Sequence, residues 1–468
     1  MSFAGKHVLV LGLGESGLAA ACWCARQGAR VRVADTRAAP PYLEELRRRV
    51  ISADFVAGEF DKALLDGINL LVLSPGLSGG LMVVIHARAA GIPVVGEIEL
   101  FARALRALGQ HVPVLAITGT NGKTTTTALT GHLLRATGKT VGVAGNISPA
   151  ALCALMDAQD ANILSQAWVL ELSSFQLETT ATLNPLAATV LNISDDHLDR
   201  YIDLDEYASV KARIFQSGEG TPGVQVLNRD DARVRRMALA DRQVISFGLD
   251  APSASEDFGL RQNRGEEWLV QGERFLLPVS ELPLAGLHNA ANAMAALALC
   301  VSVGFDANAL LPALRSFRGL PHRVEKVAEL DGVTWYDDSK GTNVGATVAA
   351  LEGLGGLGKP GRKVVVVLGG DGKGQDFSPL RKAVACHARA AVLIGRDGPL
   401  IEKVIGVVDV AIETATDMED AVRRARALAQ PGDAVLLSPA CASFDMFRNY
   451  EHRAQVFVAA VRALKAGT

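Results

Sequence analysis

The chain has 468 residues, of which 49% are hydrophobic, with 46 glycines, few aromatic residues and a formal net charge of −3. This length exceeds what one hydrophobic core usually supports, and the composition suits α/β layers joined by tight glycine turns, so several domains are expected. The small net charge gives no sign of a nucleic-acid or anionic-membrane partner, and no apolar run approaches the roughly 20 residues of a membrane span.

Six cysteines are scattered along the chain without a paired CxxC spacing. This pattern predicts reduced, unreactive thiols and a cytoplasmic protein. The first residues lead directly into a strand and lack the layout of a signal peptide, which agrees with that prediction.

Residues 1–97 alternate between apolar strands and helices, which predicts a parallel, doubly wound, Rossmann-like sheet. The run Gly12-Leu13-Gly14-Glu15-Ser16-Gly17 follows the first strand, and Asp35 ends the second. This arrangement fits the dinucleotide-binding fingerprint, although any diphosphate can bind there and a tight turn made for packing remains an alternative. Strands are predicted at residues 7–11, 29–34, 69–73 and 92–95.

The most specific motif is Gly119-Thr120-Asn121-Gly122-Lys123-Thr124, between a predicted strand at 112–117 and a predicted helix at 124–137. Backbone N–H groups and the helix N-terminus then converge on one spot, which suits the phosphates of a nucleotide. Lys123 is expected to reach the β- and γ-phosphates, and the Thr124 hydroxyl to bind Mg²⁺. The full P-loop pattern has a glycine where Ile117 stands, so the loop is shortened. A glycine-rich turn with an incidental lysine is the alternative.

Two further polar residues of the block 98–320 stand at strand ends. Glu171 belongs to a predicted strand at 168–174, and His197 follows another at 188–193. Ligands gather at the carboxyl ends of strands in α/β sheets, so both residues are expected near the phosphate loop as metal ligands or polar anchors. Each alone would more often be a surface or packing residue. The polar stretches 218–223 and 251–267 are expected to be loops or a small excursion from the sheet.

The block 321–468 predicts a second Rossmann-like, doubly wound domain. Its strands are expected at 363–368, 391–395 and 434–438, and each leads into a polar loop rich in glycine or serine. The residues alone therefore predict a cytosolic, Mg²⁺-dependent nucleotide enzyme of class α/β, with a central P-loop ATPase-type sheet between two Rossmann-like sheets.

Five motifs, in the right order and spacing, resemble those of the Mur ligases, the ATP-dependent amide-bond ligases that build the peptidoglycan stem peptide. They are residues 118–126 (TGTNGKTTT), 288–292 (HNAAN), 337–343 (DDSKGTN), 369–377 (GGDGKGQDF) and 438–443 (SPACAS). The resemblance covers essentially the whole chain. It departs from the family pattern at residues 78–84, which are less polar than is usual in the family. This departure concerns the structure of that loop alone.

Within the family, the motifs are nearest to those of the members that add D-glutamate to UDP-N-acetylmuramoyl-L-alanine. The resemblance implies a cytoplasmic, monomeric enzyme of peptidoglycan precursor synthesis, and hence of cell shape and division, with no nucleic-acid partner and no membrane insertion. Its small-molecule substrates would be ATP, UDP-MurNAc-L-Ala and D-Glu. Residues 1–97 would bind the UDP-substrate, 98–320 would bind ATP, and 321–468 would bind the amino acid.

The resemblance also implies site residues. The UDP-substrate would contact Gly14, Ser16, Asp35, Thr36, Arg37, Gly76 and Asn146. ATP would contact Gly119, Thr120, Asn121, Gly122, Lys123, Thr124, Thr125, Asn292, His322, Arg323 and Asp338. Two Mg²⁺ ions would be held by Thr124, Glu171, His197 and Lys211, the last as a carbamate formed with CO₂. D-Glutamate would contact Lys340, Thr342, Lys373, Ser443 and Tyr450, where the family more often has Phe. The catalytic set would be Lys123, His197, Lys211 and Arg323.

The implied reaction explains these residue types. A substrate carboxylate attacks the γ-phosphate of ATP, and an amine then displaces phosphate from the acyl phosphate. Two anions meet in the first step, so Lys123, Mg²⁺ and Arg323 are expected to neutralise charge. The second step needs a neutral amine and a pocket without water, which closure of the third domain over the second would provide.

Three other functions fit parts of the sequence. The first glycine motif with Asp35 suits an NAD-binding oxidoreductase with a nucleotide-regulated second domain, and Arg37 would hint at NADP. A non-catalytic nucleotide switch would also use the phosphate loop. A ligase of the folylpolyglutamate type shares this loop but does not account for the Rossmann-like domain at the N-terminus.

Overall fold

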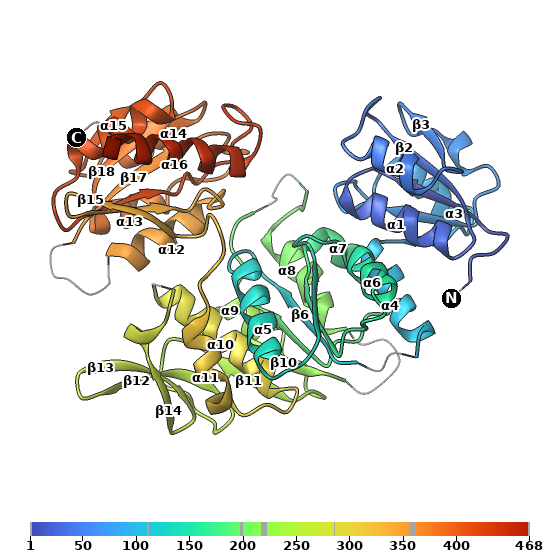
Figure 1. Cartoon of the computed structure of the whole chain (residues 1–468), viewed down its shortest axis with the longest axis horizontal. Helices are drawn as coiled ribbons and strands as arrows, with labels where there is room; N and C mark the ends of the chain where they lie inside the picture. The colour runs from blue at the N-terminus through green and yellow to red at the C-terminus, as the bar shows by residue number, and fades with distance from the viewer. Residues whose placement is uncertain are drawn as a thin grey trace. The chain divides into compact units, whose positions relative to one another are not determined.

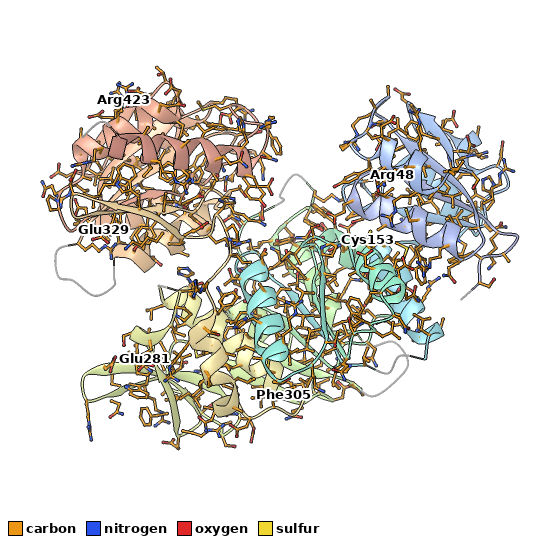
Figure 2. All side chains as sticks on the ribbon, in the orientation of Figure 1. Arg48, Cys153, Glu281, Phe305, Glu329 and Arg423 are labelled. Carbon is orange, nitrogen blue, oxygen red and sulfur yellow. The ribbon has the colours of Figure 1, made fainter. Side chains whose placement is uncertain are left out.

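The computed structural model describes residues 2–109, 112–196, 200–216, 222–284, 286–355 and 362–466. These residues form three sheets of five, nine and six strands with helices between them (Figure 1). Contacts divide the chain into two compact units, of which the first holds residues 1–193, 199–276 and 293–314, and the second holds 194–198, 277–292 and 315–468. Polar helix faces meet solvent, as exposed Arg48 and Arg423 illustrate (Figure 2). No described helix has both the length and the apolar character that crossing a bilayer requires.

The first sheet has the order β3-β2-β1-β4-β5, and all of its pairs are parallel. Val8 and Val10 pack with helices α1 and α2, whereas Leu9 and Leu11 pack with α3, so β1 is covered on both faces. This explains its uninterrupted apolar run. The predicted doubly wound sheet is confirmed, and β3 is an additional strand. The elements are β1 His7–Leu11, α1 Glu15–Arg26, β2 Arg30–Asp35, α2 Leu43–Arg49, β3 Asp54–Ala57, β4 Leu70–Leu73, α3 Met82–Ala89 and β5 Val94–Val95.

The nine-stranded sheet has the order β14-β13-β12-β11-β10-β9-β6-β8-β7, with β6 between β9 and β8. Its strands are β6 Val114–Thr118, β7 Val141–Gly145, β8 Ala167–Glu171, β9 Ala187–Val190, β10 Val224–Asn228, β11 Val244–Phe247, β12 Phe258–Asn263, β13 Glu266–Gln271 and β14 Arg274–Pro278. Its helices, with the connecting α4, are α4 Glu97–Ala107, α5 Lys123–Ala136, α6 Ala151–Asp160, α7 Ser174–Glu178, α8 Leu204–Ala212, α9 Ala232–Arg235, α10 Leu287–Val301 and α11 Ala307–Ser316.

Strands β12 and β13 form an antiparallel hairpin in the stretch 251–267 and beyond, where the sequence favoured loops or a small excursion. Arg264 and Gly265 make the turn with φ values of 54° and 82°. Two adjacent positive φ angles give the twist that a two-residue hairpin needs. Both strands belong to the nine-stranded sheet, so the expectation of loops or a small excursion was wrong for residues 258–263 and 266–267. Of the other stretch expected to be a loop, 218–223, residues 218–221 lie outside the described part of the chain.

The third sheet has the order β15-β16-β20-β17-β18-β19 and is parallel except for the β15–β16 pair. Helices α12, α13 and α14 cover one face, and α15 and α16 cover the other, so β17 is buried throughout. The elements are β15 Glu325–Leu330, β16 Val333–Asp337, α12 Val344–Gly355, β17 Val364–Gly369, α13 Leu380–His387, β18 Ala388–Ile394, α14 Gly398–Ile405, β19 Ala411–Thr414, α15 Met418–Leu428, β20 Ala434–Leu437 and α16 Tyr450–Ala466.

The N-terminus of α6 is capped by carboxylates from other elements. Its own N-cap, Ala150, provides no side-chain hydrogen bond. Glu15, the first residue of α1, accepts from Ser148 Oγ at 2.7 Å and from Ala150 N at 3.0 Å. Glu97, the first residue of α4, accepts from Leu152 N at 2.6 Å. Both side chains accept hydrogen bonds from groups at the N-terminus of α6 that its own residues leave unpaired, so they help to fix α6 against α1 and α4.

Glu97→Gln is expected to make the protein less sensitive to pH. Burial raises the pKa of Glu97 from 4.5 to about 7, and the nearby Glu15 charge adds a smaller increase. The hydrogen bond from Leu152 N lowers this pKa but does not outweigh burial. The folded state therefore holds a proton that the unfolded state releases, and this stabilisation is complete below pH 4.5 and is lost as the pH rises through 7. Glutamine imitates the protonated form, so we expect a gain on the order of 1–3 kcal/mol at pH 8 and little gain at pH 5.

Urea unfolding at the two pH values measures this difference. Glu44→Gln is the matched control, because the Glu44 side chain is 86% exposed. An equal effect of Glu97→Gln at both pH values would contradict the assignment of the proton to Glu97.

Candidate active site

The predicted phosphate loop joins the end of β6 to the start of α5. Gly119 and Gly122 have φ values of 148° and 82°, and a Cβ on Gly119 would lie 2.9 Å from Leu191 Cβ. Both positions therefore require glycine. Gly122 is required for its backbone conformation, and Gly119 is required for its conformation and because a side chain would not fit. Thr124 and Thr125 follow as buried residues in the first turn of α5. The strand, loop and helix predicted for this motif are confirmed.

Asn192, just after β9, fixes the conformation of this loop. Thr120 N donates to Asn192 O at 2.9 Å, and Asn121 N donates to Asn192 Oδ1 at 2.8 Å. Asn192 Nδ2 returns a bond to Asn121 O at 3.1 Å. No role was predicted for Asn192, because its partners are backbone groups far away in sequence.

Two lysine ammonium groups meet at this loop. Lys123 Nζ donates to Gly119 O at 2.8 Å and to Thr120 O at 2.7 Å. Lys211 Nζ, from α8, donates to the same Gly119 O at 3.0 Å and lies 4.5 Å from the centre of the Tyr207 ring. Lys211 is only 1% exposed. The two ammonium groups are thus close together, and that of Lys211 is buried. Repulsion and burial both disfavour two positive charges here, so the site suits an anionic ligand or a modification that makes one lysine anionic.

Glu171 offers a carboxylate oxygen that is free to bind a cation. It ends β8, next to β6 in the sheet, and pairs in register with Ile117. Oε1 accepts from Asn146 Nδ2 at 2.7 Å, whereas buried Oε2 has no hydrogen-bond partner among the described residues. A Cβ on Gly145 would lie 2.3 Å from Glu171 O, so the Asn146 loop packs tightly against the strand end. Carboxylate oxygen is the ligand type that Mg²⁺ prefers, and these residues fit such an ion. His197, the other predicted metal ligand of this kind, lies outside the described residues.

The predicted UDP-substrate residues of the first sheet lie at one edge. Gly14 and Ser16 follow β1, Thr36 and its neighbours follow β2, and Gly76 follows β4. The strand order reverses between β1 and β4, and ligands of open α/β sheets bind at this switch point. Asn146 comes from the nine-stranded sheet. Apart from Asn146, the residues predicted to bind the UDP-substrate therefore lie together at one edge of the first sheet.

Asp35 is fully engaged by the protein. Its Oδ2 accepts from Leu13 N at 2.7 Å and from Arg37 Nη2 at 2.8 Å, and its Oδ1 accepts from Arg37 N and Nε at 2.9 and 2.8 Å. The Arg37 guanidinium lowers the pKa of Asp35 to about 2 despite burial. In a dinucleotide-binding enzyme this carboxylate must accept from the ribose hydroxyls. Asp35 would have to give up existing bonds to do so, which disfavours the oxidoreductase alternative.

The second unit presents the predicted nucleotide residues His322, Arg323 and Asp338. His322 Nδ1 is hydrogen-bonded to Asp337 Oδ2 at 2.7 Å, and Asp338 Oδ2 accepts from Ser438 Oγ at 2.6 Å. Burial raises the pKa of Asp338 to about 7, although the Ser438 hydroxyl and Arg323 lower it. The residues on both sides of Arg323 have positive φ, 63° at His322 and 47° at the β-branched residue 324. Strain of this kind is typical of functional sites.

The predicted amino-acid residues form two groups at the carboxyl edge of the third sheet. Lys340 Nζ lies 5.0 Å from the centre of the Tyr450 ring. The loop of Lys373 and the loop of Ser443 are joined by backbone bonds between Asp371 and Ala442, at 3.0 and 2.8 Å. Lys373 is exposed and Ser443 is buried.

Asn292 and Thr342 are less informative. Asn292, in α10, donates to Asn289 Oδ1 at 3.2 Å. Thr342 N donates to Lys340 O at 2.9 Å, which closes the turn before α12. Asp337, which holds His322, received no role in the sequence analysis, although it opens the DDSKGTN motif.

Known proteins resemble this chain over its full length. Models of the Mur ligase MurD-like N-terminal domain, the Mur ligase middle domain and the Mur ligase glutamate ligase domain match residues 6–96, 117–300 and 322–441. A UDP-N-acetylmuramoylalanine–D-glutamate ligase of Aromatoleum aromaticum is 59% identical over 466 residues, covering 98% of each chain. The chain belongs to the Mur ligase family. The enzyme of the same name from Nitrosomonas europaea is 52% identical over 99% of this chain and 98% of its own.

Membership of the Mur ligase family makes the chain an ATP-dependent ligase that forms an amide bond. The oxidoreductase and the non-catalytic switch are thereby excluded, and the MurD-like model at the N-terminus excludes the folylpolyglutamate type. The UDP-N-acetylmuramate–alanine ligase of Thermotoga maritima is 19% identical, with a TM-score of 0.59 over 98% of this chain and 99% of that chain. That likeness supports the three-domain Mur ligase fold.

Proposed function

We propose that this chain adds D-glutamate to UDP-N-acetylmuramoyl-L-alanine, with hydrolysis of ATP to ADP and phosphate through an acyl phosphate. The observation that carries the substrate assignment is the identity of 59% to a ligase of that name across 98% of both chains. The enzyme would act in the cytoplasm as a monomer, in peptidoglycan precursor synthesis. Residues 1–97 would bind the UDP-substrate, 98–320 would bind ATP, and 321–468 would bind D-glutamate.

The phosphate loop is proposed to hold ATP and to stabilise charge during phosphoryl transfer. Lys123 would turn from Gly119 O and Thr120 O to the phosphates, so that the attacking carboxylate meets a partly neutralised γ-phosphate. Mg²⁺, held by Thr124, Glu171 and His197, would supply further positive charge. Arg323, with Asn292, His322 and Asp338, is proposed to contact the same nucleotide.

Lys211 is proposed to act as a carbamate. Its ammonium would lose a proton, its nitrogen would form a bond to the carbon of CO₂, and a second proton would leave, so that one positive charge becomes one negative charge. The shared contact of Lys211 and Lys123 with Gly119 O supports this change, because attraction would replace repulsion between their side chains. The carboxylate formed would be a further oxygen ligand for Mg²⁺.

A phosphate-release assay tests the proposed substrates. The enzyme, ATP and UDP-MurNAc-L-Ala are mixed with a panel of D- and L-amino acids. We expect phosphate release to depend on D-glutamate and to be far slower with L-glutamate or D-alanine. Release that is equally fast with another amino acid, or that does not depend on an amino acid, would refute the assignment.

Lys373→Ala is expected to raise the KM for D-glutamate about 10- to 100-fold, the value of one lost charge-assisted hydrogen bond. Glutamate has two carboxylates, so its site needs separated cationic and hydroxyl groups, which Lys373, Lys340 and Ser443 would supply. The KM values for ATP and the UDP-substrate should stay nearly unchanged in steady-state kinetics. A residue that only closes its loop would instead lower thermal stability and leave glutamate kinetics intact. An equal loss of ATP affinity would show that the glutamate site lies elsewhere.

A further inference from the structure

The side chain of Gln375 connects three loops of the third sheet. It lies in the loop that follows β17, within the GGDGKGQDF motif. Its Oε1 accepts from Val344 N at 2.9 Å, and its Nε2 donates to Ala440 O at 2.8 Å. Val344 begins α12 after the β16 loop, and Ala440 belongs to the loop after β20. Both ends of one amide are therefore used to join neighbouring loops.

Each of the three loops carries at least one residue proposed to bind glutamate. Thr342 precedes Val344 by two positions, Lys373 precedes Gln375 by two, and Ser443 follows Ala440 by three. Backbone bonds join these loops in pairs: Ala440 N donates to Gly341 O at 3.0 Å, and Asp371 pairs with Ala442. The Gln375 amide spans all three, so it sets their common spacing.

The loops need such a connection because their backbones are not in conformations that their residues favour. Lys373 and Ala440 have φ values of 51° and 61°, in the left-handed region that is unfavourable for residues with a Cβ. Gly370, between β17 and Lys373, has a φ of 132° and no room for a side chain, since a Cβ would lie 2.3 Å from Ala442 O. Contacts from outside must hold these segments, and the bond from Gln375 to Ala440 O fixes one of them directly.

We infer that Gln375 is a positioning residue that sets the distance between the anion-binding groups of the glutamate site and thereby selects the length of the amino-acid substrate. This inference rests on the proposed function. Gln375 would act through Val344 and Ala440, to which its amide is bonded, and it is not one of the residues proposed to bind glutamate. D-Aspartate differs from D-glutamate by one methylene, so a fixed separation of Lys373 and Ser443 favours one dicarboxylate over the other.

Gln375→Met tests the inference, because methionine has similar length and cannot make either hydrogen bond. We expect the KM for D-glutamate to rise about 10-fold and the preference for D-glutamate over D-aspartate in kcat/KM to fall at least fivefold. Acyl phosphate formation without glutamate, measured by trapping with hydroxylamine, should keep its rate. Gln375→Asn retains an amide but is too short to reach both partners, and it should show the same changes if Gln375→Met does not fold.

Two reference variants make the outcomes separable. Gln430→Met carries the same substitution at an exposed position of this unit and should behave as the unaltered enzyme. If Lys373→Ala raises the KM for D-glutamate and neither Gln375 variant does, the positioning role is refuted while the proposed function stands. If neither the Lys373 variant nor the Gln375 variants affect glutamate, the proposed site is misplaced and the inference falls with it. A fall in stability and in hydroxylamine trapping, with unchanged preference between the dicarboxylates, would show a purely structural role.

Discussion

Lys123→Ala is expected to slow acyl phosphate formation about 10²- to 10³-fold, as the loss of one preorganised charge at a transition state typically does. The Lys123 ammonium lies at the start of α5 and donates to Gly119 O and Thr120 O of the loop. Its side chain is partly exposed and lies outside the hydrophobic clusters, so the fold should survive the change. The loss should therefore appear in chemistry rather than in stability.

Hydroxylamine trapping of the acyl phosphate, with ATP and UDP-MurNAc-L-Ala but without glutamate, isolates this step. Lys403→Ala, at an exposed position of α14, is the control and should retain full activity. Circular dichroism melting should give the same midpoint for both variants and the unaltered enzyme. Near-normal trapping by Lys123→Ala would remove Lys123 from the mechanism.

Fold prediction succeeded where burial on both faces leaves a clear pattern. The strands β1, β6 and β17 are continuous apolar runs because helices cover both faces of their sheets, and such runs stand out in the sequence. The first three residues of strand β12 are buried, whereas the last three are partly or fully exposed. Its polar end and the Arg264–Gly265 turn look like a loop when only composition is considered. Outer strands with one solvated end were therefore the main omission.

For some of the predicted site residues, chain position alone fixes the place in the fold, whereas their roles stay predictions. Lys123 follows a glycine turn, and Glu171 ends an apolar strand, so the topology of an α/β sheet brings both to one edge. Asn192 and Gln375 act on backbone groups of distant loops, and nothing in their local sequence shows which loops these are. Asp35 was correctly placed at a strand end, but its engagement by Arg37 and Leu13 N depends on side-chain geometry that a motif does not contain.

Lys211→Ala is expected to leave almost no ligase activity, and short carboxylic acids should partly restore it. Lys211 is buried beside the phosphate loop, with its ammonium 3.0 Å from Gly119 O. If the active form is a carbamate, alanine removes a carboxylate and leaves space that acetate or formate can fill. The same acids should not restore Lys123→Ala, because a carboxylate cannot replace a cation that stabilises the transferring phosphoryl group. This contrast separates filling of a carboxylate position from a general salt effect.

The rescue is measured as phosphate release against formate concentration, with sodium chloride at equal ionic strength as the control. The carbamate itself is observed by ¹³C NMR of the unaltered enzyme in ¹³C-labelled bicarbonate, where one resonance should disappear in Lys211→Ala. Removing CO₂ from the buffer should lower activity, and adding bicarbonate should return it. An ammonium at Lys211 that titrates freely in fully active enzyme would contradict the carbamate. Glu171 Oε2 would then have to bind Mg²⁺ without a second carboxylate from α8.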